Sequence, residues 1–148
     1  MAPRRRKLAA VVLTLSVLMT LAVFGTLKAY RIPSANMEPT LHCAKPNPGC
    51  RGETSDRVVG LRYLFGKDAS RGDIVAYEIP PEAAARCGSV PGATHVSRVQ
   101  SIEGETLRVR GDFREQSCDS SVWGPLPRDR LVAKIVFRYW PLDRLGTP

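Results

Sequence analysis

The sequence of 148 residues lacks internal repeats and low-complexity segments, and beyond residue 27 it lacks a convincing amphipathic helix. Its hydrophobic fraction of 43% and charged fraction of 24% are ordinary for a folded domain, which argues against disorder. After the N-terminus no stretch interleaves basic and aromatic residues, so the net charge of +8 does not indicate a nucleic-acid-binding protein. The shortage of soluble helical patterns favours a mostly β domain.

The positive charge is concentrated at the start of the chain. Residues 4–7 are Arg-Arg-Arg-Lys, and they precede the twenty residues 8–27, which carry no charged side chain. A helix of that length spans about 30 Å, the thickness of the hydrocarbon core of a bilayer. We therefore predict a single transmembrane helix whose basic flank lies on the cytoplasmic side, as the positive-inside rule describes.

A cleaved signal peptide is the alternative interpretation of residues 8–27. Its apolar region should be about 7–15 residues long and end in a small-x-small site, whereas this run is longer. We expect an uncleaved anchor and three segments: a cytoplasmic N-terminus (residues 1–7), the anchor (residues 8–27) and an extracytoplasmic domain (residues 28–148). The expected location is the plasma membrane, with the lipid bilayer as a partner.

Short β-prone runs separated by turn residues make up most of the remaining chain. Apolar or alternating stretches rich in β-branched residues predict strands, and clusters of Gly and Pro predict loops. We expect Gly60 to weaken the strand that contains it. The expected strands cover residues 58–65, 74–77, 95–100, 107–110 and 131–139, and the expected loops cover residues 41–60 and 80–92.

All four cysteines, Cys43, Cys50, Cys87 and Cys118, lie beyond the predicted anchor. An even number of cysteines in an exported domain favours disulfide bonds, and four cysteines permit three connectivities. Cys43–Cys50 is the natural local pair, which leaves Cys87 for Cys118. A zinc site would need thiolates at tighter paired spacing, so we expect no metal ion.

Residues 32–41 read Ile-Pro-Ser-Ala-Asn-Met-Glu-Pro-Thr-Leu, and their two prolines predict an extended start and a turn at the end. This segment resembles the nucleophile box of type I signal peptidases, Pro-Ser-x-Ser-Met-x-Pro-Thr-Leu. Further stretches resemble the other boxes of that family in the same order: residues 71–75 (Arg-Gly-Asp-Ile-Val), 95–99 (His-Val-Ser-Arg-Val), 111–124 and the tail at 137–141. On these motifs the chain is identified as a member of the family.

The resemblance implies a serine nucleophile and a lysine base whose pKa is lowered by burial. In this sequence the nucleophile position is Asn36 and the lysine position is Ser97. The other positions carry residues of the family's kind: Ser34 at the oxyanion-hole position, Ser117 at the position that orients the lysine, and Arg98, Asp112, Arg114 and Asp119 in the charged support. The resemblance implies no cofactor.

The departures from the family fall where the chemistry should take place. An amide has no oxygen that a base could activate, and loss of the nucleophile costs about six orders of magnitude in a comparable serine protease. Phe113 and Ser121 replace an asparagine and an arginine of the last box. Only seven residues lead from Gly104 to Gly111, where the family has further strands, so the domain should be shortened.

We therefore expect a membrane-anchored, catalytically impaired signal peptidase homologue that binds signal peptides of exported preproteins or partners an active peptidase. A second hypothesis is an active peptidase that uses Ser34 as nucleophile and His95 as base. A third is a decayed chain without a stable function. Arg98 and Asp112 have the simpler interpretation of a structural ion pair, and His42 that of a loop histidine without a role.

Overall fold

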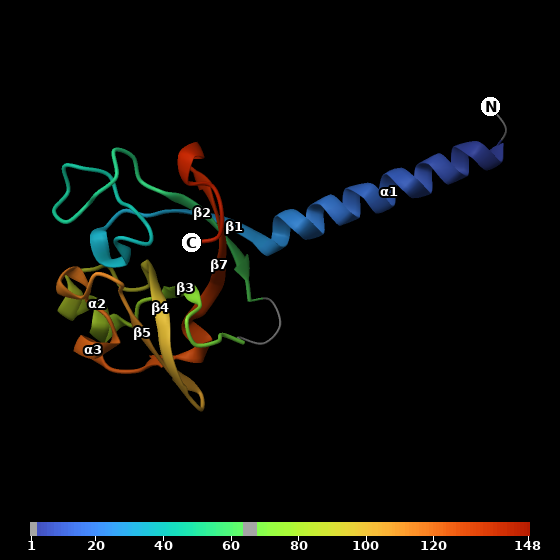
Figure 1. The fold of residues 1–148 in the computed structure, drawn as a ribbon. Helices are drawn as coiled ribbons and strands as arrows, with labels where there is room; N and C mark the ends of the chain where they lie inside the picture. Colours follow the sequence, from blue (N-terminus) through green and yellow to red (C-terminus); the bar gives the residue numbers. More distant parts are fainter. Residues whose placement is uncertain (1–2, 64–67) are drawn as a thin grey trace.

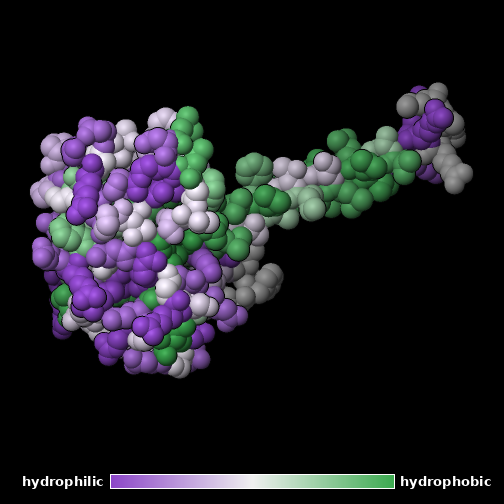
Figure 2. Space-filling view, viewed as in Figure 1, coloured by the Kyte–Doolittle hydropathy of each residue, from purple (hydrophilic) through white to green (hydrophobic). Residues whose placement is uncertain are grey.

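The structure, a computed structural model, describes residues 3–63 and 68–148 (Figure 1). Helix α1 (Pro3–Thr26) projects away from the folded domain, and most of its surface is apolar (Figure 2). Its part Arg5–Thr26 is long and apolar enough to cross a membrane, and its most apolar stretch is not buried against the domain. A signal sequence near an N-terminus would have the same properties.

After α1 the chain folds into one antiparallel sheet of seven strands in the order β1-β2-β7-β3-β4-β5-β6. This confirms the prediction of a short, mostly β domain behind one N-terminal apolar helix. The strands are β1 (Leu27–Arg31), β2 (Arg57–Arg62), β3 (Ile74–Glu78), β4 (Thr94–Glu103), β5 (Thr106–Arg110), β6 (Leu126–Pro127) and β7 (Leu131–Trp140).

Four of the five expected strands lie within observed ones, and the fifth needs correction at its end. The run predicted over residues 58–65 forms β2, which ends at Arg62, and residues 64–65 lie outside the described part of the chain. Strand β1 was not predicted. Leu27, assigned by its hydropathy to the anchor, is the first residue of this strand and pairs with Leu61 of β2.

Strand β3 lies in the middle of the sheet, and its two faces are both buried. Ile74 and Ala76 point into one hydrophobic cluster, whereas Val75 and Tyr77 point into another. Because side chains alternate along a strand, a run without polar residues is what burial on both faces requires. The two clusters together form the core of the domain.

The loop predicted over residues 80–92 is wrong in its first half, which forms helix α2 (Pro81–Cys87). Proline is tolerated at the first helical position, the following Ala-Ala-Ala-Arg residues favour helix, and Gly88 ends it in the left-handed conformation with φ of 61°. Ala83 and Ala84 are buried beneath it. The remaining helical segments are short: α3 (Ser120–Trp123), η1 (Ala35–Met37), η2 (Arg114–Gln116), η3 (Arg128–Arg130) and η4 (Leu142–Arg144).

Gly60 serves the packing of β2 rather than weakening it. A Cβ at this position would lie 2.9 Å from the ring of Tyr30 on β1 and 2.9 Å from Cβ of Ala133 on β7. Contacts that close do not occur between real side chains, so only glycine lets the neighbouring strands approach here.

One disulfide and a buried carboxylate hold the loop between β1 and β2, and a second disulfide joins the end of α2 to the segment before α3. Cys43 pairs with Cys50 and Cys87 pairs with Cys118, the connectivity that the sequence favours. The buried carboxylate of Glu38 accepts hydrogen bonds from the backbone N–H groups of Cys43 and Arg51, each at 3.0 Å. Its other oxygen contacts Nδ1 of His42 at 2.5 Å. The expectation that His42 has no role is therefore wrong, because its ring is bonded to a buried carboxyl group.

Asp56 is fully buried and joins the start of the domain to its end. Its carboxylate lies 3.4 Å from Nη1 of Arg138 on β7 and 3.1 Å from Nη1 of Arg144 on η4. Both guanidinium groups also donate to the carbonyl oxygen of Thr40, at 2.9 and 3.2 Å. The backbone N–H of His42 donates to the same carboxylate at 2.9 Å.

We expect Asp56→Asn to destabilise the domain by about 3 kcal/mol, because it leaves two partly buried arginines without their counter-charge. Urea unfolding of the detergent-solubilised protein, followed by tryptophan fluorescence, measures the change. Glu53→Gln is the matched control, because the ion pair between Glu53 and Lys45 is exposed and its loss should leave the stability almost unchanged. Equal effects of the two substitutions would contradict a special role of Asp56.

Candidate functional site

The segment that resembles the nucleophile box follows β1 directly. Ser34 has extended backbone angles, φ of −136° and ψ of 161°, and the chain then turns through η1. This agrees with the extended start and the turn that the prolines predict. Because Ala35 and Met37 are buried beneath the turn, Ser34 and Asn36 remain at the surface.

The side chain of Asn36 is held from two sides. The hydroxyl of Ser34 donates to its Oδ1 at 3.0 Å, and its Nδ2 donates to the carbonyl oxygen of Val96 on β4 at 2.6 Å. Its own carbonyl oxygen accepts from the backbone N–H of Phe113 at 3.0 Å. Asn36 thus links the first box to β4 through its side chain and to the last box through its backbone carbonyl.

Gly111 lets the last box approach the first. A Cβ on Gly111 would lie 2.5 Å from the carbonyl oxygen of Asn36, and it would overlap the hydroxyl of Ser117 more severely. Only a residue without a side chain fits between them. The structure therefore brings Ser117 close to Ser34 and Asn36, although more than eighty residues separate Ser117 from them in the sequence.

Asp119 organises the loop that follows Gly111. Its carboxylate accepts from the hydroxyl of Ser117 at 2.6 Å, from the N–H of Gly111 at 2.9 Å, and from the N–H and hydroxyl of Ser121 at 3.0 and 2.7 Å. It thereby caps the N-terminus of α3. Burial alone would raise the pKa of Asp119, but these hydrogen bonds outweigh it and the pKa lies below its usual value.

Ser97, at the family's lysine position, is buried within the sheet. Its hydroxyl lies 3.3 Å from the hydroxyl of Tyr77 on the neighbouring strand β3. Burial raises the pKa of Tyr77 to about 12, the hydrogen bond to Ser97 lowers it, and the charge of Asp119 adds to the increase. The hydroxyl of Tyr77 therefore lies beside that of Ser97 in the buried part of the sheet.

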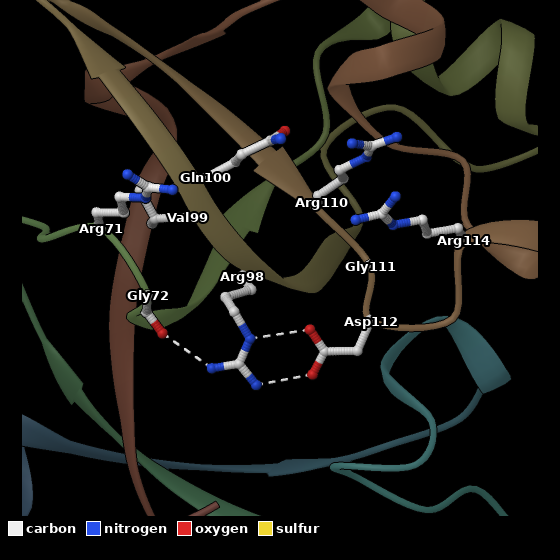
Figure 3. A pocket seen from close by; sticks show the side chains of 9 residues that line it. All are labelled: Arg71, Gly72, Arg98, Val99, Gln100, Arg110, Gly111, Asp112 and Arg114. Carbon is white, nitrogen blue, oxygen red and sulfur yellow. Dashed lines mark hydrogen bonds and ion pairs between the residues drawn. The ribbon is translucent and has the colours of Figure 1, made fainter.

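Arg98, in the middle of β4, and Asp112, just after β5, form a two-point ion pair (Figure 3). Nε of Arg98 donates to one oxygen of Asp112 at 2.9 Å and Nη2 donates to the other at 2.7 Å, while Nη1 reaches the carbonyl of Gly72. Thr40 donates to the same carboxylate at 2.5 Å. Burial raises the pKa of Asp112, but the bonds from Arg98 and Thr40 more than compensate and keep the pKa low. Arg114 is exposed and joins none of these bonds.

Ser34 and His95 line one small cavity of about 110 Å³ between the first box and the start of β4. Their side chains are engaged elsewhere, because Ser34 donates to Asn36 and Nε2 of His95 is bonded to the hydroxyl of Ser89 at 2.9 Å. Burial lowers the pKa of His95. The cavity is lined by Tyr30, Arg31, Ile32, Pro33, Ser34, Asn36, Thr94, His95 and Val96.

Three residues of this region were missed by the sequence analysis: Tyr77, Thr40 and Glu38. Tyr77 looked like an ordinary core residue of a strand, and its hydroxyl matters only because Ser97 lies opposite. Glu38 and Thr40 lie within the first box, but a motif does not reveal that their side chains are buried or paired. Within residues 3–63 and 68–148 no group of His, Cys, Asp and Glu side chains is arranged to hold a metal ion.

Comparison with known proteins matches residues 85–140 to the family model "Signal peptidase, peptidase S26". A probable signal peptidase I-2 from Synechocystis sp. is 25% identical over 80% of this chain and 66% of its own length. A signal peptidase I from Leptolyngbya laminosa is 38% identical over 32% of this chain and 23% of its own length. The mitochondrial ATP-independent inner membrane protease subunit 1b of Arabidopsis thaliana is 26% identical over 75% of this chain and 69% of its own length.

The chain spans less than two thirds of the length of either signal peptidase I relative. The matched family model covers the part of the chain that contains β4, β5, the ion pair of Arg98 with Asp112 and the loop organised by Asp119. The longer alignments cover three quarters or more of the chain. In agreement with its sequence motifs, these matches support the type I signal peptidase family for this chain.

Proposed function

We propose that this chain is a membrane-anchored signal peptidase homologue without peptidase activity, which retains a groove for an extended peptide. The observation that carries the proposal is the pair Asn36 and Ser97 at the two positions of the catalytic dyad. The amide of Asn36 is fixed by hydrogen bonds to Ser34 and Val96 and has no group to attack a peptide. The hydroxyl of Ser97 is committed to Tyr77 and cannot serve as a base.

Peptide binding is supported by an open edge of the sheet. Residues 94–97 of β4 pair with β3 on one side, whereas β5 begins to pair with β4 only at Arg98. In the described part of the chain no strand covers the other edge of residues 94–97, and Asn36 contacts it through Val96. An extended peptide can bind such an edge by strand addition, with its side chains entering the adjacent cavity.

The membrane arrangement follows from the helix and the charges beside it. We propose that α1 anchors the protein in the plasma membrane, with its basic N-terminus in the cytoplasm and the sheet domain outside. The two disulfides agree with an oxidising compartment. The proposed ligands are signal peptides of exported preproteins, and an active signal peptidase is the proposed protein partner.

The alternative function is peptide cleavage by Ser34 and His95. In its favour, both residues line the same cavity, and burial keeps His95 neutral at pH 7. Against it, His95 is bonded to Ser89 and the hydroxyl of Ser34 to Asn36, so both bonds would have to break before the pair could react. The displaced pair would also leave the oxyanion-hole position without its serine.

We expect the purified full chain to bind a fluorescent signal peptide in detergent without cleaving a preprotein. Ser34→Phe should fill the cavity of about 110 Å³ and weaken peptide binding about tenfold or more. Ser101→Phe, farther along β4, is the control and should leave binding unchanged. Fluorescence anisotropy measures binding, and gel analysis of the preprotein measures cleavage. Cleavage that is abolished separately by Ser34→Ala and by His95→Ala would replace this proposal by the alternative one.

We expect the double variant Asn36→Ser with Ser97→Lys to cleave a preprotein at less than about a hundredth of the rate of an ordinary signal peptidase. A lysine at position 97 would meet the buried hydroxyl of Tyr77, which lies 3.3 Å from that of Ser97, and a misplaced catalytic group loses about two orders of magnitude. Adding Tyr77→Phe removes the competing hydroxyl and should raise the rate. A double variant as fast as an ordinary signal peptidase would show that the scaffold needs no further change.

We propose that the retained carboxylates now act on stability, which predicts acid sensitivity. Because the pKa of Asp119 is lowered in the folded protein, its stabilising contribution is present at pH 7 and is lost as pH falls through that lowered pKa. Asp119→Asn should cost about 2 kcal/mol at pH 7, and its difference from wild type should shrink below about pH 4. Urea unfolding across pH 3–7 measures this. Asp68→Asn is the control, because the side chain of Asp68 is 97% exposed. If the difference in unfolding free energy between wild type and Asp119→Asn did not change with pH, the stabilising role of the Asp119 carboxylate would be contradicted.

A further inference from the structure

A second cavity, of about 330 Å³, lies beyond the ion pair of Arg98 with Asp112 and is lined by four arginines (Figure 3). Its volume is at the lower end of the range of small-molecule sites. None of Ser34, Asn36 and Ser97 belongs to it. The residues that line it are Arg71, Gly72, Arg98, Val99, Gln100, Arg110, Gly111, Asp112 and Arg114.

The protein supplies one carboxylate to this cavity, and that carboxylate is already occupied. Both oxygens of Asp112 accept from Arg98, and Thr40 donates to one of them as well. Among the described residues, Arg71, Arg110 and Arg114 form no ion pair or hydrogen bond through their side chains. Three positive charges around the cavity therefore lack a counter-charge from the protein.

The positions of the arginines concentrate this charge. Arg98 and Arg110 are direct partners across β4 and β5, so their side chains leave the sheet from neighbouring positions. The charge of Arg98 is balanced by Asp112, whereas that of Arg110 is not. In Figure 3 Arg114 reaches from its loop toward Arg110, and Arg71 stands on the other side of β4. Gln100 adds a neutral amide.

We propose that this cavity binds a phosphate-type oxyanion group, held by Arg71, Arg110 and Arg114. Guanidinium groups present paired N–H donors whose spacing matches two oxygens of a phosphate, and charge-assisted bonds of this kind are about twice as strong as neutral ones. The ion pair of Arg98 with Asp112 forms one wall and keeps Arg98 from competing for the ligand. The site does not depend on the proposed loss of peptidase activity, because it contains neither dyad position.

The same chemistry could be offered by a free phosphate or by the headgroup of an anionic lipid. The full chain in a nonionic detergent at low salt is titrated with inorganic phosphate, and separately with dihexanoylphosphatidylglycerol and the zwitterionic dihexanoylphosphatidylcholine. Phosphorus NMR and calorimetry follow binding. We expect saturable binding of an anionic ligand that weakens as salt is added.

The variant Arg110→Gln with Arg114→Gln should weaken this binding by about tenfold or more. Its control is Arg62→Gln with Arg130→Gln, which removes the same charge outside the cavity and should bind like wild type. Arg71→Gln, on the other side of β4, should also weaken anion binding. It replaces the first double variant in the test if that variant has a lower unfolding temperature than wild type.

Each outcome decides the proposal. It is supported if anion binding is lost in the cavity variants and kept in the control variant. If phosphate binds, a free oxyanion suffices; if phosphatidylglycerol binds and phosphate does not, the site is one for a lipid headgroup. The proposal is overturned if neither anion binds, if phosphatidylcholine binds equally well, or if the two double variants lose binding equally. None of these results bears on preprotein cleavage, so failure here leaves the proposed function standing.

Discussion

The buried carboxylate of Asp56 is the interaction on which the position of the first box depends. It neutralises Arg138 and Arg144 from the last strand and helix, and the same guanidinium groups hold the carbonyl of Thr40. A buried charge cluster of this kind is stable only when every member is present. The segment that carries Asn36 is thus fixed from the far end of the chain as well as by bonds to its own neighbours in sequence.

From the opposite side, the first box is held by the loop after β5. Gly111 admits the carbonyl of Asn36 and the hydroxyl of Ser117 at close range, and Asp119 ties that loop to α3. The two positions that the motifs assign to the dyad carry an amide that donates to Val96 and a hydroxyl that lies beside that of Tyr77.

The sequence predicted the strands with strong alternation and the boxes that meet at the site, because both depend on local pattern. It did not predict α2, since alanine and proline suggest a loop until the burial of Ala83 and Ala84 is known. It assigned Leu27 to the anchor because hydropathy cannot tell the last residue of a helix from the first residue of an apolar strand. Glu38 and Asp56 look like surface acids in sequence, and only the tertiary contacts bury them.

The direct junction of α1 with β1 limits the distance between the end of the helix and the first box. The helix ends at Thr26 and the sheet begins at Leu27, with no residue between them to act as a tether. Eight steps of extended chain lead from Thr26 to Ser34 and cover about 26 Å, so Ser34 cannot lie farther than that from the helix end. If α1 crosses a bilayer, the first box stays within that distance of the membrane surface.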